Sequence, residues 1–332
     1  MSVTASHHLS WVDTHCHLDA AEFASDLHRV VADAAKNQVK AILLPAVKAG
    51  DFQLVKALTA QYSDLLPGLV YTLGIHPLYI NQAKESDIAT LRGYIEASLS
   101  DARFVGIGEI GLDYFVEGLD PRRQEWFFHE QLKLAEYYQL PVVLHVRRSQ
   151  DAILKALRPR KVPGGIAHAF NGSFQQAEQF IGLGFKLGFG GAATYERALQ
   201  IRRLLKELPL ESIVTETDAP DIPAAWLKQE GLTFNEPAFL PRIANTLADI
   251  RGIGVDAFAT AVWRNAMQAF PRWATVCATN PHLPVVSQAF ASCDYGVYRR
   301  GFVSLFFTIS ARGLAVVSAH TIAGCFAGFI QA

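Results

Sequence analysis

The 332-residue sequence has little cysteine and no excess of either charge. Its four cysteines form no CxxC pair and are too few for a disulfide-stabilised secreted domain, so a cytoplasmic location is expected. With 30 Lys and Arg against 31 Asp and Glu, the chain lacks the basic field that drives non-specific binding to nucleic acid. Residues 1–10, an N-terminal tail, lack the basic start and apolar stretch of a signal peptide. Because the chain has no basic field, any contact with DNA or RNA must come from local groups at a site.

Half of the residues are apolar, which is enough for a large core. Short apolar segments rich in β-branched residues alternate with amphipathic segments between residue 11 and about residue 218. The predicted strands are 11–16, 40–46, 69–75, 103–110, 141–146, 164–170, 185–190 and 212–217. Continuous apolar strands are typical of a parallel sheet covered by helices, and eight β-α units over roughly 260 residues fit a closed (β/α)8 TIM barrel. An open doubly wound sheet is the alternative, but no GxGxxG turn follows the first strand.

The amphipathic segments predict the helices of the barrel's outer ring. Residues 122–138 have the helical period, and Pro121 suits the first turn of such a helix. Residues 236–252 and 255–270 are expected to complete the ring. The barrel domain is therefore predicted over residues 11–272.

Residues 273–332 form an apolar C-terminal extension of different composition. From Thr275 onwards there are four charged residues and neither Lys nor Glu. Residues 313–332 have no formal charge except for His320, and this stretch is long enough to span a bilayer. Its Gly and Ala content argues against a membrane segment. The alternatives are a tail that packs on the barrel and an extension foreign to it.

The stretch VDTHCHLD at residues 12–19 places two histidines at the end of the first strand. Alternate residues of a strand share a face, so His15 and His17 project together while Cys16 faces the other way. We do not expect Cys16 to touch a metal. Alone, the pair is equally consistent with metal binding and with two hydrogen-bonded polar residues.

Four further strands end in side chains of the metal-ligand type: Glu109, His145, His168 and Asp218. The carboxyl ends of barrel strands gather in one mouth, and six such groups buried there without a metal would leave costly unpaired groups. A lone catalytic zinc commonly uses three protein ligands. The set of six therefore predicts two divalent ions that share a carboxylate. Mixed nitrogen and oxygen ligands suit Zn and permit Mn, Mg, Ni or Co.

Several motifs resemble those of the TatD family of metal-dependent hydrolases, particularly its YjjV-like branch. They are VDTHCHLD (12–19), GIHP (74–77), VGIGEIGLDY (105–114), RQEWFFHEQLKLA (123–135), LPVVLHVRRS (140–149), HAFNGS (168–173), ETDAPD (216–221) and NEP (235–237). The motifs occur in order, and the resemblance covers residues 11–272.

The resemblance implies an amidohydrolase-like barrel in which Glu109 takes the bridging place of a carboxylated lysine. It implies that His15, His17 and Asp218 serve one metal, that His145 and His168 serve the other, and that Glu109 serves both. The family is known for metal-dependent deoxyribonuclease activity, including 3′ to 5′ exonuclease action on single strands. The expected partner is therefore DNA or another phosphodiester substrate, with no obligate protein partner.

The expected chemistry is hydrolysis by a water that loses its proton at the metals. Asp218 would act as general base, and His76 and Arg147 are candidates for binding the phosphate. A hydrogen-bonded strand-end histidine and a surface salt bridge are the alternative interpretations of His76 and Arg147. Two other functions stay open: hydrolysis of amide, ester or lactone bonds, including an aminoacyl-tRNA ester, and a non-enzymatic scaffold tethered to a membrane by the apolar tail.

Overall fold

A computed structural model describes residues 9–281 and 283–284. Its eight strands are parallel and follow one another around the sheet in chain order. They are β1 (Trp11–Asp13), β2 (Val39–Pro45), β3 (Gly68–Leu73), β4 (Phe104–Asp113), β5 (Val142–Arg147), β6 (Gly165–Ala167), β7 (Phe185–Phe189) and β8 (Ile213–Thr215). Each lies within or next to a predicted segment, so the (β/α)8 barrel is confirmed.

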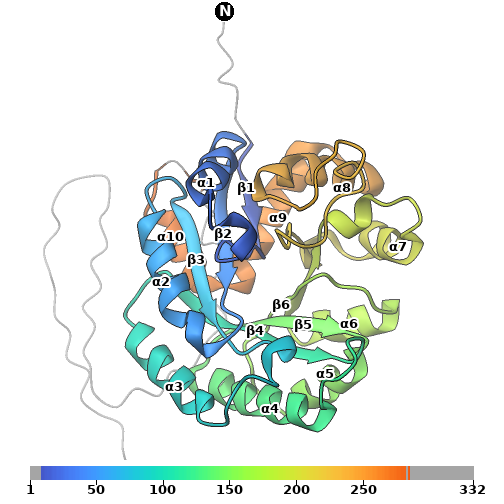
Figure 1. Cartoon of the computed structure of the whole chain (residues 1–332). Coiled ribbons are helices and arrows are strands. Elements are labelled where there is room, and N and C mark those ends of the chain that lie inside the picture. Colours follow the sequence, from blue (N-terminus) through green and yellow to red (C-terminus); the bar gives the residue numbers. More distant parts are fainter. Residues whose placement is uncertain (1–8, 282, 285–332) are drawn as a thin grey trace, which may run out of the picture. The chain divides into compact units, whose positions relative to one another are not determined.

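Helices surround the strands on the outside of the barrel (Figure 1). They are α1 (Leu27–Lys36), α2 (Phe52–Gln61), α3 (Asp87–Ser98), α4 (Pro121–Tyr138), α5 (Gln150–Leu157), α6 (Phe174–Gly182), α7 (Leu199–Glu207), α8 (Leu240–Arg251), α9 (Val255–Ala269) and α10 (Pro271–Ala278). Helix α4 begins at Pro121 as predicted, and the Asp120 carboxylate accepts a hydrogen bond from the Arg122 N–H at 2.9 Å. Helices α8 and α9 lie in the two segments expected to complete the ring.

Hydrogen bonds between the first and last strands close the barrel. The Thr14 N–H donates to the Thr215 carbonyl at 3.0 Å, and the Thr215 hydroxyl donates to the Val12 carbonyl at 2.9 Å. Beyond the strand ends, the Asp218 N–H donates to the His15 carbonyl at 2.8 Å, and the His17 N–H donates to the Ala219 carbonyl at 2.8 Å. The seam therefore joins two of the segments that carry predicted metal ligands.

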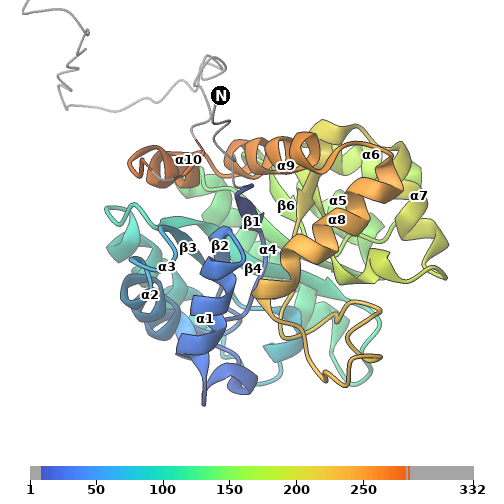
Figure 2. The same ribbon diagram turned by 90° about the horizontal axis from the view of Figure 1, so that it is seen from above.

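Helices α9 and α10 cover the end of the barrel opposite the predicted ligands. Figure 2 shows them next to each other on one side of the strands. Their side chains pack against the apolar side chains of the barrel interior, such as Val70, Val105 and Val143. Trp273 in α10 is fully buried, and its indole N–H donates to the Gly68 carbonyl at 2.8 Å. This end of the barrel is thus filled by an apolar layer.

The opposite end is polar because of the side-chain alternation along the strands. Val143 and Ile166 belong to the apolar layer, and two residues further on the same face come His145 and His168. Polar side chains therefore follow directly on the apolar layer, at the carboxyl ends of the strands.

Strand β4 is longer than the sequence predicts. Glu109 was expected to end the strand, but the strand continues to Asp113. The pairing with β5 shifts register between Ile107 and Ile110, so Glu109 sits at an irregularity inside the strand. The predicted end of the strand was wrong because the polar side chain of Glu109 interrupts an apolar run in the sequence. Pairing with β5 nevertheless continues the strand beyond Glu109.

Helix α10 spans the position at which the sequence places the start of the C-terminal extension, and it packs against α9, β3 and β4. The extension over residues 285–332, including the apolar stretch 313–332, lies outside the described residues and stays a prediction. Among the residues that the model describes, no helix is both long and apolar enough to cross a membrane.

We predict that Trp273→Ala destabilises the barrel by about 3–5 kcal/mol, because the substitution leaves a cavity in the apolar layer and an unpaired Gly68 carbonyl. Urea unfolding followed by circular dichroism measures the free energy of unfolding. Trp126→Ala is the matched control, because Trp126 is 37% exposed on α4. Equal losses in the free energy of unfolding of the two variants would contradict the role of α10 in covering this end of the barrel.

Candidate metal centre

The barrel fold brings all six predicted ligands together at the carboxyl ends of its strands. His15 and His17 follow β1, Glu109 lies in β4, His145 lies in β5, and His168 and Asp218 follow β6 and β8. Glu109 is 2% exposed and lies at the centre of the group. Its two carboxylate oxygens face different sets of side chains.

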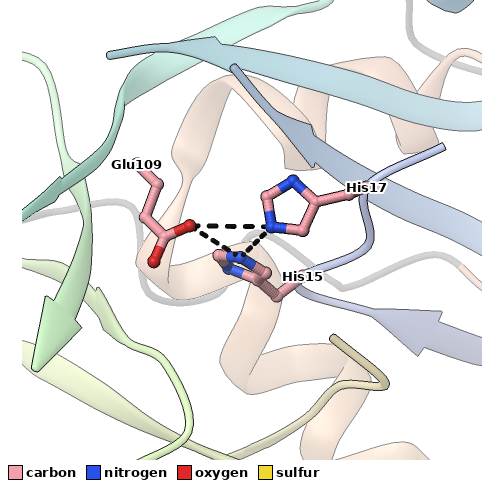
Figure 3. Close-up of side chains that lie close together, drawn as sticks. All are labelled: His15, His17 and Glu109. Carbon is pink, nitrogen blue, oxygen red and sulfur yellow. Dashed lines mark hydrogen bonds and ion pairs between the residues drawn. The ribbon is translucent and has the colours of Figure 1, made fainter. Parts of the chain in front are cut away.

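The first set faces the Glu109 Oε2 atom. That oxygen is 3.1 Å from His15 Nε2 and 3.7 Å from His17 Nε2. Figure 3 shows these three side chains pointing toward one another. The two histidine nitrogens are 3.2 Å apart. Asp218 Oδ1 lies 3.5 Å from His15 Nε2 and 3.7 Å from His17 Nε2. Four potential donor atoms thus converge on one small volume.

The second set faces the Glu109 Oε1 atom. His145 Nδ1 is 3.0 Å from this oxygen, His168 Nε2 is 3.2 Å away, and His76 Nε2 is 3.2 Å away. The ring of His168 stacks on that of His15 with centroids 3.9 Å apart, so the two sets are neighbours. Glu109 is the residue that they share.

The spacing of the first set fits a single cation. Four donors at ~2.1 Å from a tetrahedral ion lie ~3.4 Å from one another, and the distances from the His15 and His17 nitrogens to each other and to the two carboxylates run from 3.1 to 3.7 Å. Two imidazole nitrogens that face each other cannot both use lone pairs without a proton or a cation between them. The donor set therefore matches what a divalent ion requires.

The electrostatics of the cluster also favour a cation. Burial alone would raise the pKa of Glu109, but the charges of His76, His15 and His168 lower it well below its usual value. Burial would lower the pKa of His168, but the charges of Glu109 and Asp218 raise it well above the usual value. The buried carboxylates therefore need a positive charge beside them. This charge is either a proton on an imidazole ring or a metal ion in place of that proton.

His76 lies inside this cluster rather than at its rim. Its Nδ1 accepts a hydrogen bond from the Leu78 N–H at 3.1 Å. Burial lowers the pKa of His76 to about 4, so the ring is neutral at pH 7 and carries its proton on Nε2. Although its position matches a group of three possible ligands with Glu109 and His145, the protonated Nε2 makes His76 a hydrogen-bond donor in this geometry.

Two carboxylates that the sequence did not reveal lie beside the histidines of the second set, and one of them, Asp113, contacts a ring nitrogen at hydrogen-bond distance. Asp113 Oδ2 lies 3.0 Å from His145 Nε2, which leaves His145 Nδ1 to face Glu109. Glu216 Oε1 lies 3.7 Å from His168 Nδ1 and accepts the Ala169 N–H at 2.5 Å. A carboxylate hydrogen-bonded to a histidine ring, as Asp113 is to His145, fixes the orientation of that ring, whereas His168 Nδ1 has no hydrogen-bond partner among the described residues. Glu216 could have been found from its place two residues after Val214 on the inner face of the barrel.

Asp13 holds the backbone of the first set. Its Oδ2 accepts the Thr217 hydroxyl at 2.6 Å, and its Oδ1 accepts the N–H of Thr217 at 2.9 Å and that of His15 at 3.2 Å. Full burial raises the pKa of Asp13 to about 7, against the opposing effect of these hydrogen bonds. Asp218, one residue beyond Thr217, has a φ of 57° in the left-handed region, a strained conformation for a residue with a side chain. The hydrogen bonds of Asp13 to His15 and Thr217 hold the backbone next to Asp218 in this conformation.

Arg147 lies outside the buried cluster. Its side chain is 50% exposed and its Nη1 is 4.0 Å from Asp113 Oδ2. Cys16 is fully buried in the main apolar core and pairs with Ala219 through an isolated β-bridge, and it is not a member of the groups of described residues that could hold a metal.

Comparisons with known proteins match most of this chain to metal-dependent hydrolases. A family model described as TatD related DNase matches residues 12–271. An uncharacterised metal-dependent hydrolase of Escherichia coli, YjjV, is 38% identical over 78% of this chain and 97% of its own. The crystal structure of the E. coli YjjV protein, a TatD homologue, superposes with a TM-score of 0.73 over 79% of this chain and 98% of that chain. A Pantoea protein named 3′-5′ ssDNA/RNA exonuclease TatD is 32% identical over 78% of this chain and 98% of its own.

We predict that Asp113→Asn weakens metal binding about 10–100-fold. An amide N–H at this position would face His145 Nε2 and force the ring proton onto Nδ1, the atom that faces Glu109. Competition with a chromophoric chelator measures the affinity, and Asp249→Asn on the exposed face of α8 is the control. A folded Asp113→Asn variant with unchanged affinity would show that this contact does not support the metal centre.

Proposed function

This chain belongs to the TatD family of metal-dependent hydrolases, and we propose that it is a phosphodiesterase with two divalent cations that removes nucleotides from the 3′ end of DNA. The observation that carries the proposal is that the two carboxylate oxygens of Glu109 face different histidines. Oε2 faces His15 and His17, and Oε1 faces His145 and His168. A carboxylate with one oxygen toward each set is suited to bridge two ions.

In this proposal His15, His17, Asp218 and Glu109 hold one cation, and His145, His168 and Glu109 hold the other. Zn fits the mixed nitrogen and oxygen donors well, and Mn, Mg, Ni and Co are also compatible. When bound, such cations supply Lewis acidity and lower the pKa of water. The relative named as a single-strand exonuclease supports the choice of substrate.

The remaining roles follow from side chains of this chain. Burial raises the pKa of Asp218 to about 6, so its carboxylate is charged at pH 7 and can accept a proton from an attacking water as general base. The neutral His76 directs its Nε2–H at Glu109 Oε1, 3.2 Å away, and in this proposal it turns that N–H to a phosphate oxygen that lies beside the carboxylate. Arg147, exposed just past His145, can bind a phosphate with two parallel N–H groups.

The activity is tested with a single-stranded oligonucleotide labelled at its 5′ end. We expect stepwise shortening from the 3′ end in Zn, Mn or Mg, and no reaction after chelation. His15→Ala should reduce the rate to that of the chelated protein, because one set of donors is broken. His28→Ala, at an exposed position on α1, should leave the rate unchanged. Shortening that survives both chelation and His15→Ala would exclude the proposed centre.

The bridging role of Glu109 is tested by metal content. We expect about two ions per chain in the wild type and about one or none in Glu109→Gln, because the amide presents only one oxygen to the two sets. Elemental analysis after gel filtration gives the ratio, and Glu117→Gln on an exposed loop is the control. An undiminished ratio in Glu109→Gln would contradict the bridge.

The same donor set could activate water for attack on a carbonyl carbon. Hydrolysis of amide, ester or lactone bonds, including an aminoacyl-tRNA ester, is therefore the second candidate. A panel of these substrates beside the oligonucleotide separates the two classes by kcat/KM.

A further inference from the structure

An exposed cluster of one aromatic and two basic side chains lies beside the metal centre. Phe115, in the loop after β4, is 44% exposed. The Arg147 guanidinium carbon lies 3.9 Å from the centroid of its ring, and that of Arg148 lies 4.5 Å away. We call these three residues the Phe115 platform.

The platform is tied to the metal centre through Asp113. One oxygen of that carboxylate, Oδ1, accepts the N–H groups of Phe115 at 2.8 Å and Val116 at 2.9 Å. The other oxygen contacts His145 Nε2 at 3.0 Å. Arg147 follows His145 by two residues in β5. Both halves of the platform are therefore anchored to the same carboxylate-histidine pair.

Helix α4 adds a second anchor to the loop. The amide side chain of Gln124 is buried, accepts the Asp113 N–H at 2.7 Å and donates to the Asp113 carbonyl at 2.8 Å. The backbone from which the loop starts is thus held on both polar groups. The hydrogen bonds of Asp113 and Gln124 therefore fix the start of the Phe115 loop relative to His145.

The charges around the platform leave its arginines available. Arg148 forms no ion pair within the part of the chain that the structure describes, and Arg147 contacts a carboxylate at 4.0 Å with half of its side chain exposed. The Glu125 carboxylate accepts the Tyr114 hydroxyl at 2.8 Å, and Glu117 is exposed on the loop. Guanidinium groups that lie on an aromatic ring keep N–H donors free at their edges.

We propose that the Phe115 platform binds the nucleotide next to the one that is released, in a single-stranded nucleic acid. The base stacks on the guanidinium planes that lie over the Phe115 ring, and the adjoining phosphate binds the N–H edges of Arg147 and Arg148. This inference rests on the proposed phosphodiesterase function. Stacking on a side chain requires a base that is free of a duplex, so the platform selects single strands and tolerates any base.

A cycle of protein and substrate changes tests the platform. Oligonucleotides with one abasic site at successive positions from the 3′ end are compared with the intact strand. The proteins are the metal-loaded wild type, Phe115→Ala and Phe115→Trp. The matched control is Tyr137→Ala, because Tyr137 on α4 is a more exposed aromatic, at 72%, with Arg92 at 5.8 Å from its ring and no link to the centre.

We expect Phe115→Ala to raise the KM for the intact strand about tenfold, within the range for loss of one stacked base. Phe115→Trp should restore it, and Tyr137→Ala should not change it. With the abasic site at the stacking position, the wild type should bind as weakly as Phe115→Ala, and the two changes should not add. Additive effects at every abasic position, or an unchanged KM, would overturn the platform.

Two further measurements separate this proposal from the proposed function. Bis(p-nitrophenyl) phosphate has no second nucleotide, so its hydrolysis should not respond to Phe115→Ala; an equal loss on both substrates would mean damage to the centre and would overturn the platform. Binding of the strand to Asp218→Asn, followed by fluorescence anisotropy, reports the platform without turnover. Binding that depends on Phe115 without hydrolysis by the wild type would remove the nuclease function and keep the platform.

The arginines are tested by the salt dependence of that binding. Arg148→Gln should lower the magnitude of the slope of log Kd against log salt by about one, because one phosphate contact is lost. Glu117→Gln should not lower it. An unchanged slope in Arg148→Gln would exclude the phosphate contact.

Discussion

Glu109 is the constraint on which the rest of the structure depends. It is a carboxylate taken out of water, and five imidazole rings from different parts of the chain lie within 3.7 Å of its oxygens. Removal of a charge from water is costly unless opposite charge and hydrogen bonds replace the solvent. The histidines supply that replacement only when protons or cations lie among them. A centre of this composition is therefore adapted to bind cations before it is adapted to any particular substrate.

The hydrogen bonds that close the barrel also place the first set of ligands. The contacts of His15 with Asp218 and of His17 with Ala219 run through the backbone, and Asp13 ties the start of the chain to Thr217. Residues about two hundred positions apart thus meet only when the eighth strand has joined the first. Because this arrangement of side chains forms with the seam, a cation held by them would stabilise the closed barrel.

The sequence was sufficient for the barrel because its strands follow from local periodicity, and it also named the six side chains that meet at the carboxyl ends of those strands, whose role as metal ligands stays a prediction. Apolar runs marked all eight strands, and the ligand-type side chains followed them at the positions where parallel strands share an edge. The end of β4 was misplaced because a register shift at Glu109 depends on pairing with β5. Asp113 and Glu216 were missed because their positions beside the rings of His145 and His168 are defined only by tertiary contacts. Trp273 was assigned to the extension because composition changes nearby, whereas burial against Gly68 depends on the closed barrel.

The near balance of charge in the chain bears on how a polyanion would reach the centre. A net charge of −1 gives no long-range attraction, so affinity must arise from cations placed at the mouth. Arg147 and Arg148 provide such local charge, and Phe115 limits the orientations that their guanidinium groups can take. Asp113 contacts both the loop and His145, so a movement of the loop that shifts this carboxylate would change the orientation of the His145 ring. In the proposed function, substrate binding at the loop and metal binding at His145 are therefore linked through one carboxylate.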